Sequence, residues 1–246
     1  MRRDEWTVES PAIGTGGVVA YGHYGRPLVA FPSDGGRRTD FEDRGMVDAV
    51  GDLVEAGRVK LYCVDSYDDA SWRDGSLSLE ERARRHGRYE DWIVNHVLPR
   101  IHADCGGPTG VLLAGCSFGA YHAANFTLKR ADLFPLAICM SGVYDVSVVG
   151  GGWERGDAVY FSNPMDYVAN ADGGHLDWLR REAYLVLVCG QGMWEDTTGA
   201  LESTERFAGV LAAKGVRHEL DLWGHDVPHD WPSWRAQFAH HLPRFC

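Results

Sequence analysis

One short stretch of the chain combines a potential nucleophile with the glycines that a nucleophile at a sharp turn requires. Residues 111–126 read VLLAGCSFGAYHAANF, so Ser117 stands at the centre of a G-x-S-x-G motif, between an apolar run and an amphipathic segment. If these are a strand and a helix, the turn between them holds the serine hydroxyl above a sheet, and side chains at Gly115 and Gly119 would collide with backbone. The context favours a nucleophile over a serine that only caps a helix.

A nucleophilic serine needs a base and an acid that orients the base, and behind such a turn the chain order is serine, acid, histidine. The apolar run AYLVLVCG is followed by QGMWEDTTG, which contains Glu195 and Asp196. The next strand-like run, HELDLW, is followed by GHDVPHDWPSW, which contains His225 and His229. The residues alone leave both choices open, because either acid could cap a helix and either histidine could be a surface residue. The other nine histidines, including His122, His240 and His241, have no comparable placement.

Acyl transfer at a serine also requires hydrogen-bond donors for the oxyanion that forms on the substrate carbonyl. One donor is the backbone N–H of the residue after the nucleophile, here Phe118, and the second comes from the loop after an early strand. The corresponding loop is FPSDGG, which follows the apolar run RPLVAF. We therefore assign the second donor to the backbone N–H of Asp34.

Short apolar runs alternate with helical patterns along most of the chain. Continuous apolar strands that are each followed by a helix predict an α/β fold with a mainly parallel sheet, here of about eight strands, and helices on both faces. The first 25 residues favour an antiparallel hairpin at the sheet edge. The predicted strands are 26–32, 60–65, 111–115, 136–142, 183–190 and 218–223, and the predicted helices are 44–57, 79–102, the segment after Ser117, about 198–214 and one from about 232. Residues 1–246 are interpreted as one domain, with an insertion at about 146–180 near the site.

Composition excludes several classes of partner. The formal charge of −11 and the lack of a Lys/Arg-rich block argue against nucleic acid and against anionic membrane surfaces. No run approaches the roughly 18 apolar residues of a spanning helix, and the N-terminus does not read as a secretory signal. The six cysteines show no CxxC spacing, so we expect free thiols, no metal cluster and a cytoplasmic protein.

With these residues assembled, the chain resembles the esterase D family of α/β-hydrolases, which includes feruloyl and acetylxylan esterases, S-formylglutathione hydrolases and mycolyl-transferring antigen 85 proteins. The resemblance spans roughly residues 10–245 and is carried by GCSFG, VDSYDDASW and HDWPSW. The last is similar to the family pattern H-[DS]-W-x-x-W, in which the histidine is the base, and this implies His229 with His225 as runner-up. Some members use Glu as the acid, which implies Glu195 with Asp196 as runner-up.

The sequence departs from the family pattern in two places. Pro32-Ser33 stands where many relatives have His-Gly or Asp-Gly, and Met193 stands where feruloyl-type relatives have the acidic residue. The second departure moves the acid to Glu195 or Asp196.

The resulting hypothesis is a serine carboxylesterase that acts on a small-molecule ester and needs no metal or organic cofactor. An acyltransferase with the same triad, or a non-catalytic ligand-binding protein on the same fold, are the alternatives. The residues leave the oligomeric state open. Four aromatic residues in or beside the site loops could form the substrate pocket: Trp153, Tyr160, Trp194 and Trp231.

Overall fold

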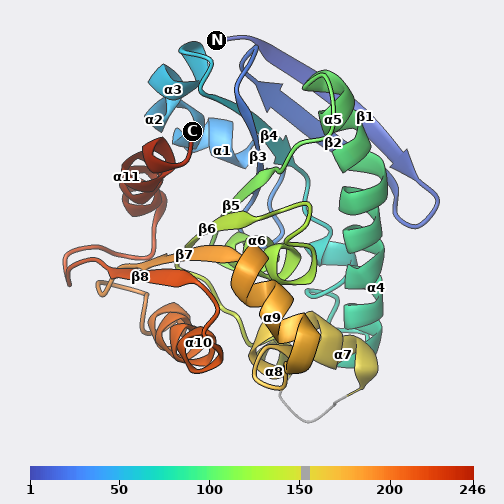
Figure 1. Ribbon diagram of the computed structural model, residues 1–246, viewed down its shortest axis with the longest axis vertical. Helices are drawn as coiled ribbons and strands as arrows, with labels where there is room; N and C mark the ends of the chain where they lie inside the picture. Colours follow the sequence, from blue (N-terminus) through green and yellow to red (C-terminus); the bar gives the residue numbers. More distant parts are fainter. Residues whose placement is uncertain (151–155) are drawn as a thin grey trace.

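Eight strands form one sheet in the computed structural model, which describes residues 1–150 and 156–246 (Figure 1). The strand order is β1-β2-β4-β3-β5-β6-β7-β8. All neighbours from β4 to β8 in this order pair in parallel. The prediction of a mainly parallel sheet of about eight strands is thus confirmed. The strands are β1 (Arg3–Ser10), β2 (Gly14–Tyr21), β3 (Arg26–Phe31), β4 (Val59–Val64), β5 (Leu112–Cys116), β6 (Leu136–Met140), β7 (Tyr184–Cys189) and β8 (His218–Leu222).

The antiparallel part of the sheet is the N-terminal hairpin. β1 pairs with β2 in the register Ser10 to Gly14, and β2 pairs antiparallel with β4. Gly14 has a φ of 78°, a left-handed conformation that glycine adopts without strain. The predicted edge hairpin is therefore present, and β1 is the outermost strand on that side.

Helices cover both faces of the sheet, which explains why the central strands read as continuous apolar runs. Residues of β5 alternate between two cores, with Leu113 in one and Leu112 in the other. Helices α4, α6 and α10 contribute to the first core, and α2, α3 and α11 to the second (Figure 1). The helices are α1 (Asp40–Asp43), α2 (Met46–Ala49), α3 (Gly51–Glu55), α4 (Leu79–Trp92), α5 (Leu98–Asp104), α6 (Phe118–Lys129), α7 (Asp157–Ser162), α8 (Pro164–Tyr167), α9 (Gly173–Glu182), α10 (Ala200–Lys214) and α11 (Trp231–His241).

Two predicted helices differ in detail from the structure. The segment predicted as one helix over 44–57 forms α2 and α3, and Gly57, the predicted stop, has a φ of 66°. The long helix predicted over 79–102 is continuous but widens to a π-helix at Ile93–Val97. Pro99 lies two residues after its end, and because proline has no N–H to give to the preceding turn, the regular bonding pattern is interrupted there. None of the described helices combines the length and the apolar character needed to cross a membrane.

The described parts of the segment at about 146–180, residues 146–150 and 156–180, fold against the start of α6. Besides the short 3-10 helix η3 (Val146–Gly150) they contain α7, α8 and most of α9. Val146 and Val159 pack in one apolar cluster with Phe118 and Tyr121, and the Tyr121 hydroxyl donates to the Ser162 carbonyl at 2.8 Å. This segment therefore packs on the residue directly after Ser117.

Candidate active site

Ser117 occupies a strained turn between β5 and α6. Its φ of 55° and ψ of −122° are unusual for a residue with a side chain, and its N–H donates to the Met140 carbonyl at 2.8 Å. A Cβ on Gly115 would come within 2.1 Å of the Gly119 carbonyl oxygen, and one on Gly119 within 2.2 Å of the Pro32 carbonyl oxygen. Glycine is therefore required on both sides of the serine for steric reasons.

His229 lies within hydrogen-bond reach of this serine. The distance from its Nε2 to Ser117 Oγ is 3.1 Å, although 112 residues separate them in the chain. The loop holding the ring is anchored on both sides, because the His229 N–H donates to the Met193 carbonyl and Asp230 caps α11 by accepting from the Ser233 N–H at 3.0 Å. The predicted contact between histidine and serine is present in the structure.

The opposite side of the imidazole contacts Glu195. Nδ1 of His229 lies 2.9 Å from Oε2 of this carboxylate, which is fully buried. The other carboxylate oxygen, Oε1, accepts hydrogen bonds from the Ser141 hydroxyl at 2.6 Å and from the Gly190 N–H at 3.3 Å. Because a buried carboxylate is stable only when it is paired and hydrogen-bonded, these contacts explain how Glu195 can face the ring in the interior.

The sequence analysis did not identify two residues that support this carboxylate, Ser141 directly and Trp234 through Ser141. The Trp234 indole donates to Ser141 Oγ at 3.0 Å, and its ring packs edge-on against His229 with centroids 4.9 Å apart. Ser141 directly follows β6, and Trp234 is the last residue of HDWPSW. Their positions after a strand and within the histidine motif were the available signals. Cys189 also lies 3.4 Å from Glu195, and burial, reinforced by that carboxylate, raises the pKa of its thiol, so it remains a weak donor.

The runner-up residues point elsewhere. His225 is exposed, and its ring makes a single long contact of 3.4 Å to the Gln191 carbonyl. Asp196 is also exposed and accepts from the Thr197 N–H at 2.8 Å. Of the two alternatives in each loop, the structure therefore brings His229 and Glu195 to Ser117.

The two assigned oxyanion donors lie on adjacent segments. Phe118 is the first residue of α6, and Asp34 lies in a turn closed by a 2.9 Å hydrogen bond from the Gly36 N–H to the Ser33 carbonyl. The close approach of Gly119 to Pro32 packs the start of α6 directly against this loop. Within the described part of the chain, no acceptor satisfies the N–H of Phe118 or of Asp34.

Of the four aromatic residues assigned to a substrate pocket, the three that the structure describes do not gather in one place. Trp194 precedes Glu195 and is 51% exposed. Trp231 packs edge-on against Trp234 and Phe41 beside the core under α11. Tyr160 lines a cavity of about 410 Å³ at the end of α6 remote from Ser117. Trp153 lies outside the described residues.

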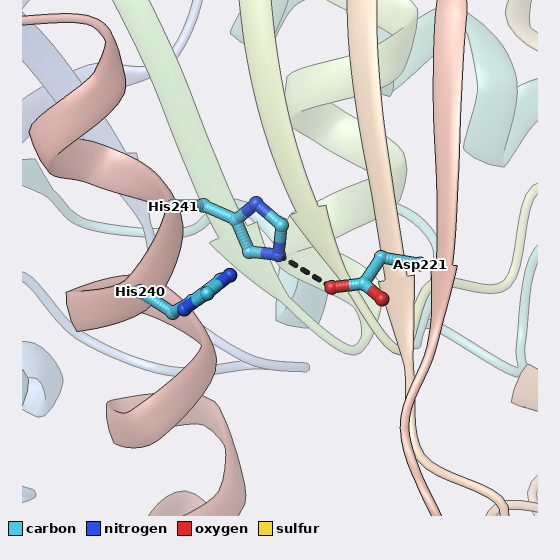
Figure 2. A group of neighbouring side chains, drawn as sticks. All are labelled: Asp221, His240 and His241. Atoms are coloured by element: carbon cyan, nitrogen blue, oxygen red, sulfur yellow. Dashed lines mark hydrogen bonds and ion pairs between the residues drawn. The ribbon is translucent and has the colours of Figure 1, made fainter.

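A second group of polar residues has the composition of a metal site. Asp221 on β8 and His240 and His241 on α11 place ligand-type atoms within 4.8 Å of one another (Figure 2). However, Asp221 Oδ2 already accepts from His241 Nε2 at 2.9 Å and from the Trp223 indole at 2.8 Å. Arg244 donates to Nδ1 of His241 at 3.0 Å, which assigns the ring proton to Nε2. Burial lowers the pKa of His241, in keeping with a neutral ring. We interpret the pair of Asp221 and His241 as a hydrogen-bonded link between β8 and α11.

A serine turn after β5, with a histidine and an acid in later loops of a mainly parallel sheet, is the arrangement of the α/β-hydrolase fold. Solved structures of that fold match nearly the whole chain. A ferulic acid esterase matches with a TM-score of 0.77 and 18% identity over 99% of this chain and 97% of that one. S-formylglutathione hydrolase from Staphylococcus aureus matches with a TM-score of 0.71 and 15% identity, over 99% of this chain and 95% of that one. MPT51 from Mycobacterium tuberculosis matches with a TM-score of 0.71 and 15% identity, over 99% of this chain and 97% of that one.

The family follows from the sequence comparison. The model of the Esterase family, described as "Putative esterase", matches residues 36–245. The chain therefore belongs to this family, and the resemblance to the esterase D relatives is confirmed. The protein is accordingly a carboxylic ester hydrolase. A comparison with curated proteins gave no sequence match.

Proposed function

We propose that the protein is a serine carboxylesterase that cleaves a small-molecule ester through an acyl-enzyme on Ser117. The observation that supports this most strongly is the continuous line of contacts from Ser117 Oγ through the His229 imidazole to the buried Glu195 carboxylate. A hydroxyl, an imidazole and a carboxylate in this order are the parts of a nucleophile, its base and the group that orients the base.

In the first half of the reaction, neutral His229 accepts the proton of Ser117 at Nε2 while Oγ attacks the ester carbonyl. Glu195 accepts the Nδ1–H of the ring, which fixes the tautomer and stabilises the imidazolium. The N–H groups of Phe118 and Asp34 bind the oxyanion of the tetrahedral intermediate. His229 then protonates the leaving alcohol, and the acyl group remains on Ser117.

In the second half, water takes the place of the alcohol. His229 removes a proton from the water, whose oxygen attacks the acyl carbon, and the same donors bind the second oxyanion. Return of the proton to Ser117 Oγ releases the carboxylic acid and regenerates the enzyme. No group beyond these residues and water takes part in the proposed sequence.

The proposal is tested with a fluorophosphonate probe and a series of chromogenic esters. We expect the parent protein to hydrolyse the esters and to be labelled at Ser117, and Ser117→Ala to lose both properties while keeping its fold. His229→Ala should lower kcat by at least about 10³-fold, whereas the matched variant His225→Ala should stay within about threefold of the parent. A folded parent that neither reacts with the probe nor cleaves any ester would reject the proposal.

A further inference from the structure

Asp68 is a buried carboxylate that the proposed reaction sequence does not use. It begins the short 3-10 helix η1 (Asp68–Ala70) after β4, and it is 1% exposed. Its Oδ1 lies 3.0 Å from Nε2 of His122, which is equally buried, and its Oδ2 accepts from the Gly35 N–H at 3.2 Å. A carboxylate removed from water in this way must be held by such donors, so both contacts are integral to the fold.

The two partners of Asp68 belong to the two segments that carry the proposed oxyanion donors. Gly35 directly follows Asp34, so its N–H is part of the peptide unit next to the one that donates. His122 lies four residues after Phe118 on α6, one helical turn away, and the two rings pack edge-on with centroids 5.2 Å apart. A single carboxylate therefore joins the loop after β3 to α6, one turn beyond the first residue of that helix.

From this geometry we infer that Asp68, through Gly35 and His122, is a positioning residue that sets the Asp34 N–H relative to the Phe118 N–H. The inference rests on the proposed function, because it concerns the donors of the oxyanion hole. A hole built from two segments works only when both are held in register, since catalytic donors must lie 2.7–3.1 Å from the place where the oxyanion forms. Packing of Gly119 against Pro32 limits how closely the segments approach. The hydrogen bonds of Asp68 to Gly35 and His122 fix the two segments relative to each other on their buried side.

The charge state of Asp68 suits this role. Burial alone would raise the pKa of its carboxyl, but the charge and hydrogen bond of His122 and the N–H of Gly35 outweigh burial and lower it. Both carboxylate oxygens therefore accept at neutral pH. The Asp68 carbonyl in turn accepts the N–H groups of Ser71 and Arg73, at 3.0 and 2.8 Å, which fixes the backbone that carries the carboxylate.

The test compares three variants by kcat per titrated active site, so that any loss of folded protein is corrected. Asp68→Ala removes both bonds, and His122→Phe keeps a ring among its aromatic neighbours but removes the donor. His122→Gln restores an N–H donor near the former Nε2 position. We expect kcat to fall about 10- to 100-fold in the first two variants with KM within about threefold, and to recover largely in the third. The amide of Gly35 should exchange with solvent faster in Asp68→Ala than in the parent.

Asp69→Asn is the matched control, because the neighbouring carboxylate is 77% exposed and its ion pair with Arg73, at 3.2 Å, lies at the surface. It should keep the parent kcat. If the parent is active and the Asp68→Ala and His122→Phe variants keep kcat within threefold, this inference alone is overturned. The same holds if KM rises by the same factor as kcat falls in these variants and His122→Gln does not restore kcat. A parent that neither cleaves esters nor reacts with the probe overturns the proposed function and this inference together. If Asp68→Ala does not fold, His122→Phe and His122→Gln decide the question.

Discussion

The Ser141 hydroxyl donates a 2.6 Å hydrogen bond to Oε1 of Glu195, the carboxylate whose other oxygen faces His229. Ser141 accepts in turn from the Trp234 indole, and its backbone has a φ of 52°. This conformation is unfavourable for a non-glycine residue, and it persists only where the surrounding structure holds it. The two hydrogen bonds of the Ser141 hydroxyl help to hold this backbone conformation and fix the direction of the Glu195 side chain.

Ser141→Ala should weaken catalysis without changing the nucleophile. It removes one hydrogen bond from Glu195 and leaves the Trp234 indole N–H without its acceptor, so we expect the free energy of unfolding to fall by about 1–3 kcal/mol. A less firmly held carboxylate should lower kcat by about tenfold. Urea unfolding and kcat per titrated site measure the two effects. Ser76→Ala, at an exposed serine, is the control, and equal behaviour of the two variants would refute the role given to Ser141.

Glu195→Gln should be far more damaging than Asp196→Asn. The amide keeps the shape of the side chain, but it presents a donor to Nδ1 of His229 and so favours the wrong ring tautomer. The analogous change in a serine protease costs about 10⁴-fold in kcat, and we expect about 10³- to 10⁴-fold here. The exposed Asp196 makes no contact with the ring, so its variant should match the parent. Steady-state kinetics of both variants on one chromogenic ester decides the assignment of the acid.

Gly119→Ala should disturb the oxyanion loop because the new methyl group meets backbone. Its Cβ would lie 2.2 Å from the Pro32 carbonyl oxygen and 2.7 Å from that of Phe31, neither of which can rotate away. We expect a loss of about 1–3 kcal/mol in the free energy of unfolding and at least about a tenfold lower kcat. Gly209→Ala in α10, where a Cβ meets nothing within 4 Å, should instead be neutral or stabilising by up to about 1 kcal/mol. Similar results for both glycines would contradict the steric argument.

Stability in acid should depend on Glu90. Burial alone would raise its pKa, but the hydrogen bond from His86 and the charge of Lys129, 2.6 Å away, lower it from 4.5 to about 2. Because the pKa is lower in the folded protein, the stabilisation is present above pH 4.5 and is lost as the pH falls towards about 2. The contribution of the ionised Glu90 carboxylate to the free energy of unfolding is at most about 3 kcal/mol. Urea unfolding from pH 7 to 3 measures the difference in the free energy of unfolding between the parent and Glu90→Gln. We expect this difference to become smaller below pH 4.5. A difference that stays constant with pH would contradict the role given to Glu90.

The sequence predicted those features that depend on local pattern and chain order. The motif around Ser117, the apolar run before it and the edge hairpin all depend on neighbouring residues, and the structure contains each of them. Placement of His229 and Glu195 came from the rule that loops at one end of a parallel sheet converge, together with the family motif. The choice against His225 and Asp196 could not come from geometry, because adjacent residues in an irregular loop have no fixed period.

Contacts between distant segments were beyond the sequence pattern. Asp68 and His122 lie 54 residues apart in the chain, and nothing in SYDDAS shows that the first of its two aspartates is buried and the second exposed. The pairing of Ser141 with Glu195 likewise depends on how β6 and β7 lie side by side. Tyr160 and Trp231 were assigned to a pocket from their loop positions, but side-chain direction at a helix start depends on packing partners that one sequence does not reveal.

Trapping an acyl group on Ser117 is the decisive experiment for the proposed mechanism. The protein is mixed with excess p-nitrophenyl acetate, quenched in acid within the first turnover, digested and analysed by mass spectrometry. We expect a burst of nitrophenol of about one equivalent per active site and a single acetyl group on the peptide that contains Ser117. Neither should appear with Ser117→Ala. An acetyl group on another residue, or unchanged turnover in Ser117→Ala, would show that Ser117 is not the nucleophile.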